Sequence, residues 1–217
     1  MLKLAIFDLD GTICNTIEDL AVATNHAMSA LGYPTHSVEQ YKIFVGNGIP
    51  KLMERSLPDG HKSSEEVLKA KDIMLSYYKE HYADYSAPYE GIIPLLQSLK
   101  AQGVGLAVCT NKAHFMAATI VDKLFHGLFD IVIGQSDAYP LKPDPASSLD
   151  IMKQFGAERE ETVFIGDSGV DMVTARNLGV SGIGVTWGFR EETELKENGA
   201  GHIVHTPQQI LEIISNL

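Results

Sequence analysis

Residues 7–12 read Phe7-Asp8-Leu9-Asp10-Gly11-Thr12, and they follow a short apolar run that begins at Leu4. The run is too brief for a helix and is typical of a strand buried on both faces. Alternate side chains of an extended segment share one side, so Asp8 and Asp10 are expected together past the strand's carboxyl end, where open α/β sheets bind ligands. A divalent cation relieves the repulsion between two such carboxylates. One carboxylate can then attack a phosphoryl group while the other transfers protons, although a chance pair of acids in a strand-to-helix turn fits these six residues equally well.

Polar residues also follow the strands predicted to end at Cys109 and Ile133. Thr110-Asn111-Lys112 is predicted to open a helix over residues 113–124, where a hydroxyl and backbone amides would bind phosphate oxygens. Thr110 also suits a plain helix cap. Lys142 lies in a loop stiffened by prolines, which leave it few alternative positions. Its ammonium group could balance a phosphoryl group, although a surface lysine in a rigid turn is the commoner case.

A third polar group follows the strand predicted to end at Ile165. Asp167 lies at the strand tip and Asp171 in the first turn of the next helix, so the two can meet on one helical face. Acids at a helix N-terminus also serve as simple caps. Together with Asp8 and Asp10 they place four carboxylates on one rim, more than the one or two that Mg²⁺ usually takes. The recurrence of polar groups at strand ends favours a phosphoryl-transfer site over chance.

The order of predicted elements indicates an α/β fold. From about residue 86 strands and helices alternate, which predicts a parallel sheet with helices on both faces. Residues 15–85 carry helical patterns without a strand. We therefore expect a doubly wound, Rossmann-like core formed by residues 1–14 and 86–217, with a small α-helical domain of residues 15–85 inserted after the first strand.

Composition narrows the class of protein. The chain has 217 residues, 45% of them hydrophobic, and a net charge of −11, which argues against a nucleic-acid binder. No signal peptide and no apolar run of membrane-spanning length is recognised. Only Cys14 and Cys109 are present, without metal-type spacing, so we expect free thiols and a cytoplasmic location.

The polar groups together resemble the four motifs of the haloacid dehalogenase superfamily, in order and spacing, over the whole chain. The matching segments are Asp8-Leu9-Asp10-Gly11-Thr12, Thr110, Lys142-Pro143 and Gly166-Asp167 with Asp171. The inserted helices resemble that superfamily's small α-helical cap. Asp10 argues against a dehalogenase, because that branch of the superfamily lacks an acid at this position.

The resemblance implies a role for each matching residue. Asp8 would be the nucleophile that forms an aspartyl-phosphate, and Asp10 would protonate the leaving oxygen and later activate water. Thr110, Lys142 and backbone amides near Asn111 would hold the phosphoryl group. The implied Mg²⁺ ligands are Asp8, the backbone carbonyl of Asp10 and Asp167, with Asp171 supporting them.

The segment Val45-Gly46-Asn47-Gly48, with Arg55 on the following helix, resembles the cap of phosphoglycolate phosphatases. This resemblance implies substrate contacts from Gly46, Asn47, Gly48 and Arg55, and it makes 2-phosphoglycolate the leading candidate among small phosphorylated metabolites. A sugar phosphomutase of the β-phosphoglucomutase type and a pyrophosphatase are alternatives on the same scaffold, and a non-catalytic binding module is the least favoured. We expect a monomer or homodimer with neither a nucleic-acid nor a membrane partner.

Overall fold

The computed structural model describes residues 1–216, which divide into two compact units. The first unit comprises residues 1–15 and 88–217 of the chain, and the second comprises residues 16–87. The second unit is thus an insertion between two parts of the first. A separate two-stranded sheet of β2 (Cys14–Asn15) and β3 (Ala87–Pro88) marks the places where the chain passes between the units.

A six-stranded sheet forms the centre of the first unit, in the order β5-β4-β1-β6-β7-β8. All neighbouring strands are parallel, and β1 lies in the middle, paired with β4 and β6. The predicted α/β class with a parallel, doubly wound sheet is therefore confirmed. The strands are β1 (Leu4–Phe7), β4 (Gly105–Ala113), β5 (Ile131–Gln135), β6 (Thr162–Gly166), β7 (Ser181–Val185) and β8 (His202–Val204).

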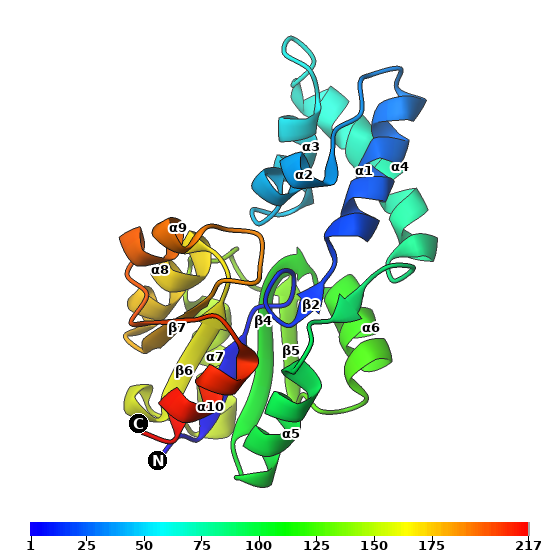
Figure 1. Cartoon of the computed structure of the whole chain (residues 1–217). Coiled ribbons are helices and arrows are strands. Elements are labelled where there is room, and N and C mark those ends of the chain that lie inside the picture. The colour runs from blue at the N-terminus through cyan, green and yellow to red at the C-terminus, as the bar shows by residue number, and fades with distance from the viewer. Residues whose placement is uncertain (217) are drawn as a thin grey trace. The chain divides into compact units, whose positions relative to one another are not determined.

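Helices cover both faces of this sheet, with α5 and α10 in front of the strands and α7 behind them (Figure 1). Leu4 and Ile6 of β1 belong to a buried cluster that also includes Ile151 of α7 and Leu178 of α8. All four residues of β1 are buried, as expected for a strand covered on both sides. The helices of this unit are α5 (Ile92–Ala101), α6 (His114–Phe125), α7 (Ala146–Phe155), α8 (Gly169–Leu178), α9 (Glu192–Glu197) and α10 (Pro207–Ile214), with a short 3₁₀ turn at Arg159–Glu161.

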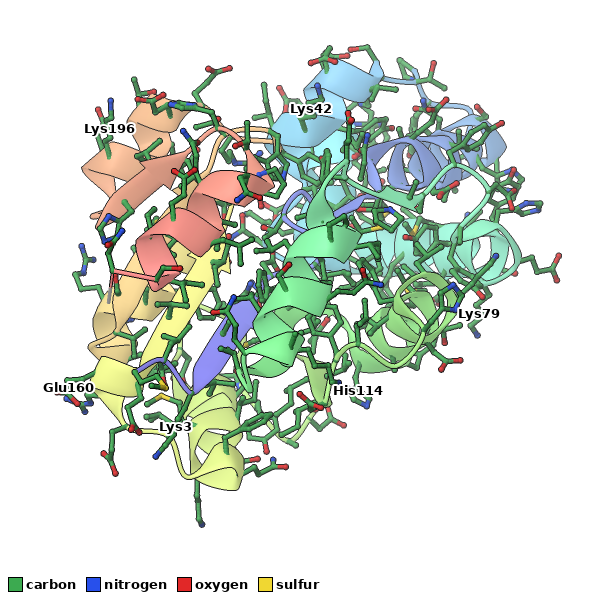
Figure 2. All side chains as sticks on the ribbon, turned by 60° about the horizontal axis from the view of Figure 1, so that its bottom comes forward. Lys3, Lys42, Lys79, His114, Glu160 and Lys196 are labelled. Atoms are coloured by element: carbon green, nitrogen blue, oxygen red, sulfur yellow. The ribbon has the colours of Figure 1, made fainter. Side chains whose placement is uncertain are left out.

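The parallel arrangement gives the two edges of the sheet different characters. Figure 2 shows Lys3 and Glu160 near the amino ends of β1 and β6, where Lys3 also forms an exposed ion pair with Glu161 at 3.0 Å. Asp8 and Asp167 directly follow the carboxyl ends of the same two strands. The chemistry-bearing residues therefore gather at the carboxyl edge, as in other open α/β sheets.

One predicted boundary is wrong. The strand was expected to end at Cys109 with Thr110 opening the helix, but β4 continues to Ala113. Helix α6 begins at His114, next to its predicted start at residue 113. The register of β4 against β5 shifts between Cys109 and Ala113, so the strand bends before it ends. The extension depends on Gly134, because a β-carbon there would lie 2.6 Å from the Lys112 carbonyl oxygen. Thr110 is therefore a strand residue and does not cap α6.

The second unit contains helices only, apart from the ends of the small sheet. Its four helices are α1 (Ile17–Ala30), α2 (Val38–Phe44), α3 (Ile49–Ser56) and α4 (Ser64–His81). Ser37 and Ser63 cap α2 and α4, each in a reciprocal capping box with the residue three positions later. Within residues 1–216 no helix combines the length and the apolarity needed to cross a membrane.

A buried carboxylate fastens the end of this unit to its beginning. Asp19 of α1 is buried, and its oxygens accept hydrogen bonds from the backbone amides of Tyr85 (3.0 Å) and Ser86 (2.8 Å) and from the Ser86 hydroxyl (2.5 Å). Hydrogen bonds to a charged acceptor are stronger than neutral ones, and a buried donor that loses its partner is costly. Sequence analysis assigned Asp19 no role.

We expect Asp19→Ala to lower the free energy of unfolding by about 2 to 4 kcal/mol, because three donors lose their acceptor. Urea unfolding followed by circular dichroism measures the loss. Asp72→Ala is the matched control, since Asp72 is an exposed aspartate of α4, and its effect should stay within about 0.5 kcal/mol. Equal effects of the two substitutions would contradict the assignment.

Candidate active site

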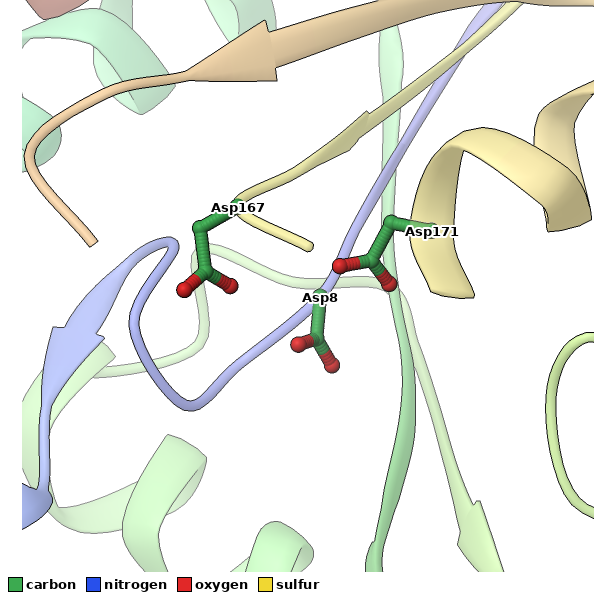
Figure 3. A group of neighbouring side chains, drawn as sticks. All are labelled: Asp8, Asp167 and Asp171. Atoms are coloured by element: carbon green, nitrogen blue, oxygen red, sulfur yellow. The ribbon is translucent and has the colours of Figure 1, made fainter. Parts of the chain in front are cut away.

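Three buried carboxylates meet at the carboxyl edge of the sheet. Asp8, Asp167 and Asp171 each offer one oxygen, and these oxygens lie within 4.8 Å of one another. Figure 3 shows the three carboxyl groups converging from the ends of β1 and β6 and from the start of α8. The sequence predicted this grouping from the parallel order of the strands. The carboxylate of Asp10 is not among the atoms that the described residues bring together here.

Two hydrogen bonds fix the Asp167 side chain, and two glycines allow neighbouring loops to approach it closely. Its Oδ1 accepts from the Thr12 hydroxyl at 3.1 Å, and its Oδ2 accepts from the Phe189 amide at 2.7 Å. A β-carbon on Gly11 or on Gly188 would approach Asp167 side-chain atoms to 2.3 Å. Gly11 also has a φ of 87°, in the left-handed region that favours glycine. The loops after β1 and β7 can therefore close around Asp167 only with glycine at these positions.

Asp171 uses both of its oxygens to hold neighbouring groups. Its Oδ2 accepts from the amide and the hydroxyl of Ser168, at 3.1 and 2.6 Å, in a capping box at the start of α8. Its Oδ1 accepts from Lys142 Nζ at 2.7 Å. Sequence reasoning weighed capping against a site role for this residue, and the structure gives it both kinds of contact.

The Lys142 ammonium group lies among three oxygens. It donates to Asp171 Oδ1 and to the Cys109 carbonyl at 3.0 Å, and it forms an ion pair with Asp8 Oδ1 at 2.8 Å. The backbone of Lys142 is held as firmly, because its amide donates to Asn111 Oδ1 (2.7 Å) and its carbonyl accepts from Asn111 Nδ2 (3.2 Å). Lys142 is therefore a buried, positioned cation and not a surface lysine.

The two predicted phosphate-binding residues of β4 have different surroundings. Thr110 is buried, and its hydroxyl oxygen accepts from the Lys112 amide at 3.3 Å. The side chain of Asn111 clamps the loop that carries Lys142, so a phosphate contact from Asn111 would come from its backbone amide. Sequence reasoning did not find this clamp, because nothing in the sequence signals a contact between residues 31 positions apart.

Asp10 forms an ion pair with Lys112, for which the sequence predicted no role. Lys112 Nζ lies 3.1 Å from Asp10 Oδ1 and 3.2 Å from Oδ2, so one ammonium group spans both oxygens. The pair joins residues 102 positions apart. Lys112 follows the predicted Thr110 directly, but alternation along a straight strand could not show which way it points past the bend in β4.

The predicted substrate residues of the second unit form their own small network. Gly46 and Gly48 both have positive φ, 115° and 80°, so the loop needs glycine at each. Arg55 of α3 donates to the Phe44 carbonyl (2.8 Å) and to Asn47 Oδ1 (2.9 Å). Arg55 thus holds the loop in place, and its predicted contact with substrate stays a prediction.

Comparison with known proteins identifies the family. The model of the haloacid dehalogenase-like hydrolases matches residues 5–185, which include all four motifs. The chain belongs to this family.

Relatives of the haloacid dehalogenase-like family that resemble this chain carry phosphatase names. A phosphoglycolate phosphatase of Pseudomonas syringae pv. tomato is 31% identical over 96% of this chain and 78% of its own length. One from Vibrio parahaemolyticus is 30% identical over 99% of this chain and 96% of its own. A crystal structure of a predicted phosphoglycolate phosphatase from Haemophilus somnus has a TM-score of 0.91 at 30% identity and covers 98% of both chains. The enzyme class expected from the sequence, a phosphatase hydrolase, is confirmed at the level of the family and its named relatives.

The charges of the site fit a divalent cation of the kind this family resemblance implies. The four carboxylates of Asp8, Asp10, Asp167 and Asp171 face the ammonium groups of Lys112 and Lys142, so two negative charges remain when all are ionised. Among the described residues Asp8 Oδ1 accepts no hydrogen bond despite its ion pair. Carboxylate oxygens are ligands that Mg²⁺ prefers. The donor set therefore fits such an ion.

Burial perturbs the protonation of these groups. Burial raises the pKa of Asp8 to about 6, with Lys142 opposing the rise. Burial also raises the pKa of Asp167 to about 8, reinforced by the charges of Asp171 and Asp8. For Lys142, burial alone would lower the pKa, but the carboxylates of Asp171 and Asp8 outweigh it and raise the pKa above its usual value. A cation close to the aspartates would favour their ionised forms.

The raised aspartate values predict how stability depends on pH without metal. Unfolded aspartates lose their protons near pH 4, whereas folded Asp8 and Asp167 keep theirs to about 6 and about 8. The folded state binds more protons in this range, so their contribution to stability falls as the pH rises from about 4 to about 8. Mg²⁺ binds the ionised forms, so we expect it to raise Tm more at pH 8 than at pH 5, by several degrees.

Thermal unfolding with Mg²⁺ or with a chelator, at both pH values, measures this difference. Asp167→Asn is the comparison, because it lacks the group with the larger shift and should show a weaker pH dependence. An identical response of the two proteins to both pH and Mg²⁺ would show that Asp167 does not control the binding.

Proposed function

We propose that the protein is a Mg²⁺-dependent phosphomonoester hydrolase that acts on a small phosphorylated metabolite through an aspartyl-phosphate intermediate. The observation that carries the proposal is the buried arrangement around Asp8, whose carboxylate lies against a fixed ammonium group and two further carboxylates. Such a group is shielded from bulk water yet surrounded by charges that can stabilise a phosphoryl group.

The proposed reaction has two steps, which share Asp8 and Asp10. In the first, a carboxylate oxygen of Asp8 forms a bond to phosphorus, the ester P–O bond breaks, and Asp10 gives its proton to the leaving oxygen. In the second, a water oxygen attacks phosphorus, the bond to Asp8 breaks, and Asp10 takes the proton from the water. Asp8 and Asp10 thereby return to their starting states, and inorganic phosphate is released.

The remaining residues would position the phosphoryl group. The Lys142 ammonium group and the Thr110 hydroxyl would contact its oxygens, together with the backbone amide of Asn111. The proposed Mg²⁺ ligands are Asp8, Asp167 and the Asp10 backbone carbonyl, with Asp171 in support, and the ion would neutralise charge on the phosphoryl oxygens. The hydrogen bonds that Lys142 donates to Asp171 and Asn111 would keep it in place while substrate enters and leaves.

The substrate proposed is 2-phosphoglycolate. Support comes from the relatives named phosphoglycolate phosphatase, at 30–31% identity over nearly the whole chain. A β-phosphoglucomutase from Clostridium difficile shares the fold, with a TM-score of 0.81, but at 20% identity that likeness carries no argument about activity. The buried free thiols of Cys14 and Cys109 agree with the cytoplasmic location that we propose.

We expect inorganic phosphate release from 2-phosphoglycolate to require Mg²⁺ and to fall by at least about 1,000-fold in Asp8→Asn, because an amide cannot form the intermediate. Colorimetric phosphate assays measure it over a panel that includes sugar phosphates, nucleotides and pyrophosphate. Asp122→Asn, an exposed aspartate of α6, is the matched control and should keep wild-type activity.

Each other outcome has a distinct meaning. Faster turnover of another monoester would support the proposed reaction but refute 2-phosphoglycolate as the substrate. Transfer of phosphate between sugar positions without release would indicate the mutase. No reaction with any compound would refute the hydrolase.

We also propose that Gly46, Asn47, Gly48 and Arg55 recognise the organic part of the substrate, supported by the rigid loop that Arg55 maintains. In the double variant Asn47→Ala/Arg55→Met we expect kcat/KM for 2-phosphoglycolate to fall about 10- to 100-fold, and that for p-nitrophenyl phosphate to change little. Lys51→Met, on the same helix, is the control. Unchanged relative kcat/KM values for the two substrates would defeat this assignment.

A further inference from the structure

Lys112 differs from almost every other lysine that forms an ion pair in the described residues. Its side chain is 3% exposed and that of Asp10 is 13% exposed. By contrast, the side chains of Lys3, Lys42, Lys51, Lys62, Lys100 and Lys196, which also form ion pairs, are at least 33% exposed. Burial of an ammonium group costs free energy, whereas a lysine that only improves solubility can remain exposed. A buried lysine at the carboxyl edge of the sheet therefore calls for a local reason.

The position of Lys112 is fixed by its backbone. Its amide donates to the Thr110 hydroxyl oxygen, and its carbonyl packs where Gly134 has no β-carbon. Strand β4 extends beyond Thr110 to Ala113, which carries Lys112 past the predicted phosphate-binding residue. The ammonium group then meets both oxygens of Asp10 at nearly equal distances, 3.1 and 3.2 Å.

We propose that Lys112 is the positioning residue for Asp10. It holds the Asp10 carboxyl group in one orientation, with its ammonium group against both oxygens. The proposal rests on the hydrolase function proposed above, in which Asp10 is the proton donor. In this scheme Lys112 acts through Asp10 and does not itself contact the substrate.

The first chemical step shows what this pairing contributes. As the ester P–O bond breaks, the proton moves from the Asp10 carboxyl to the leaving oxygen, and Asp10 becomes an anion. The ammonium group 3.1 Å away restricts the orientation of this carboxyl group, and a proton donor is effective only when it is correctly oriented. The need for the proton grows as the leaving oxygen becomes more basic. Lys112 should therefore matter most for alkyl esters and least for esters of acidic phenols.

The same geometry separates Lys112 from Lys142. Lys142 donates to Asp171 and lies against Asp8, the atoms proposed to hold metal and form the intermediate. The Lys112 ammonium group instead contacts both carboxylate oxygens of Asp10. Loss of Lys142 should therefore affect every substrate, whereas loss of Lys112 should act through Asp10.

A double-mutant cycle with Asp10→Asn and Lys112→Met tests the proposal. Single-turnover rates are measured with Mg²⁺ on aryl phosphates of similar size, from p-nitrophenyl to p-methoxyphenyl phosphate, and on 2-phosphoglycolate. We expect Lys112→Met to lower kcat about 100-fold for 2-phosphoglycolate, with little change in KM, and less than about 10-fold for p-nitrophenyl phosphate. In the Asp10→Asn background the same substitution should have almost no further effect.

Two further variants separate positioning from general damage. Lys112→Arg keeps the charge and should recover part of the activity on poor leaving groups, whereas Lys153→Met, at an exposed site of α7, should behave as wild type. Circular dichroism and Tm of each variant report folding. Equal losses for all leaving groups, or an undiminished effect in the Asp10→Asn background, would overturn the proposal. Failure of the wild-type protein to hydrolyse any monoester would instead refute the hydrolase function.

Discussion

The repulsion between carboxylates at the carboxyl edge of the sheet is the constraint on which the site depends. Asp8, Asp167 and Asp171 are brought within 4.8 Å because parallel strands end at one edge, and burial deprives them of the water that would screen their charges. Such a cluster is stable only when protons or cations compensate it. With Asp10 the site holds four carboxylates against the ammonium groups of Lys112 and Lys142, and the two negative charges that remain when all are ionised match a divalent ion.

The surrounding loops are arranged to keep this cluster in place. Gly11 and Gly188 let two loops approach Asp167 to distances that a β-carbon would forbid, and Asn111 binds both backbone groups of Lys142. These contacts join parts of the chain that follow four different strands. A group that must act repeatedly without moving needs this kind of support, since a small displacement costs much of the catalytic advantage of correct orientation.

The sequence predicts the fold and the main residues of the site for a definable reason. An apolar run followed by acids after one strand, and acids again after another, is readable because strand period and parallel order alone bring Asp8 and Asp167 to the same edge. The bend in β4 was not readable, since it depends on the contact of Lys112 with Gly134 across two strands. For the same reason the strand was expected to end too early, at Cys109, and the partners of Asn111 and Lys112 were missed. Asp19 was missed because the groups that donate hydrogen bonds to it lie more than 60 positions away.

The two buried lysines show how one residue type serves different purposes through its partners. Lys142 lies in a loop, where three oxygens from three segments fix its ammonium group near the proposed nucleophile. Lys112 lies in a strand, where its ammonium group contacts both oxygens of the Asp10 carboxylate. Lys142 thus connects three segments of the chain around Asp8, whereas Lys112 fixes the orientation of the Asp10 carboxyl group. In the proposed reaction the first lysine would keep a positive charge beside the nucleophile, and the second would hold the proton donor in position.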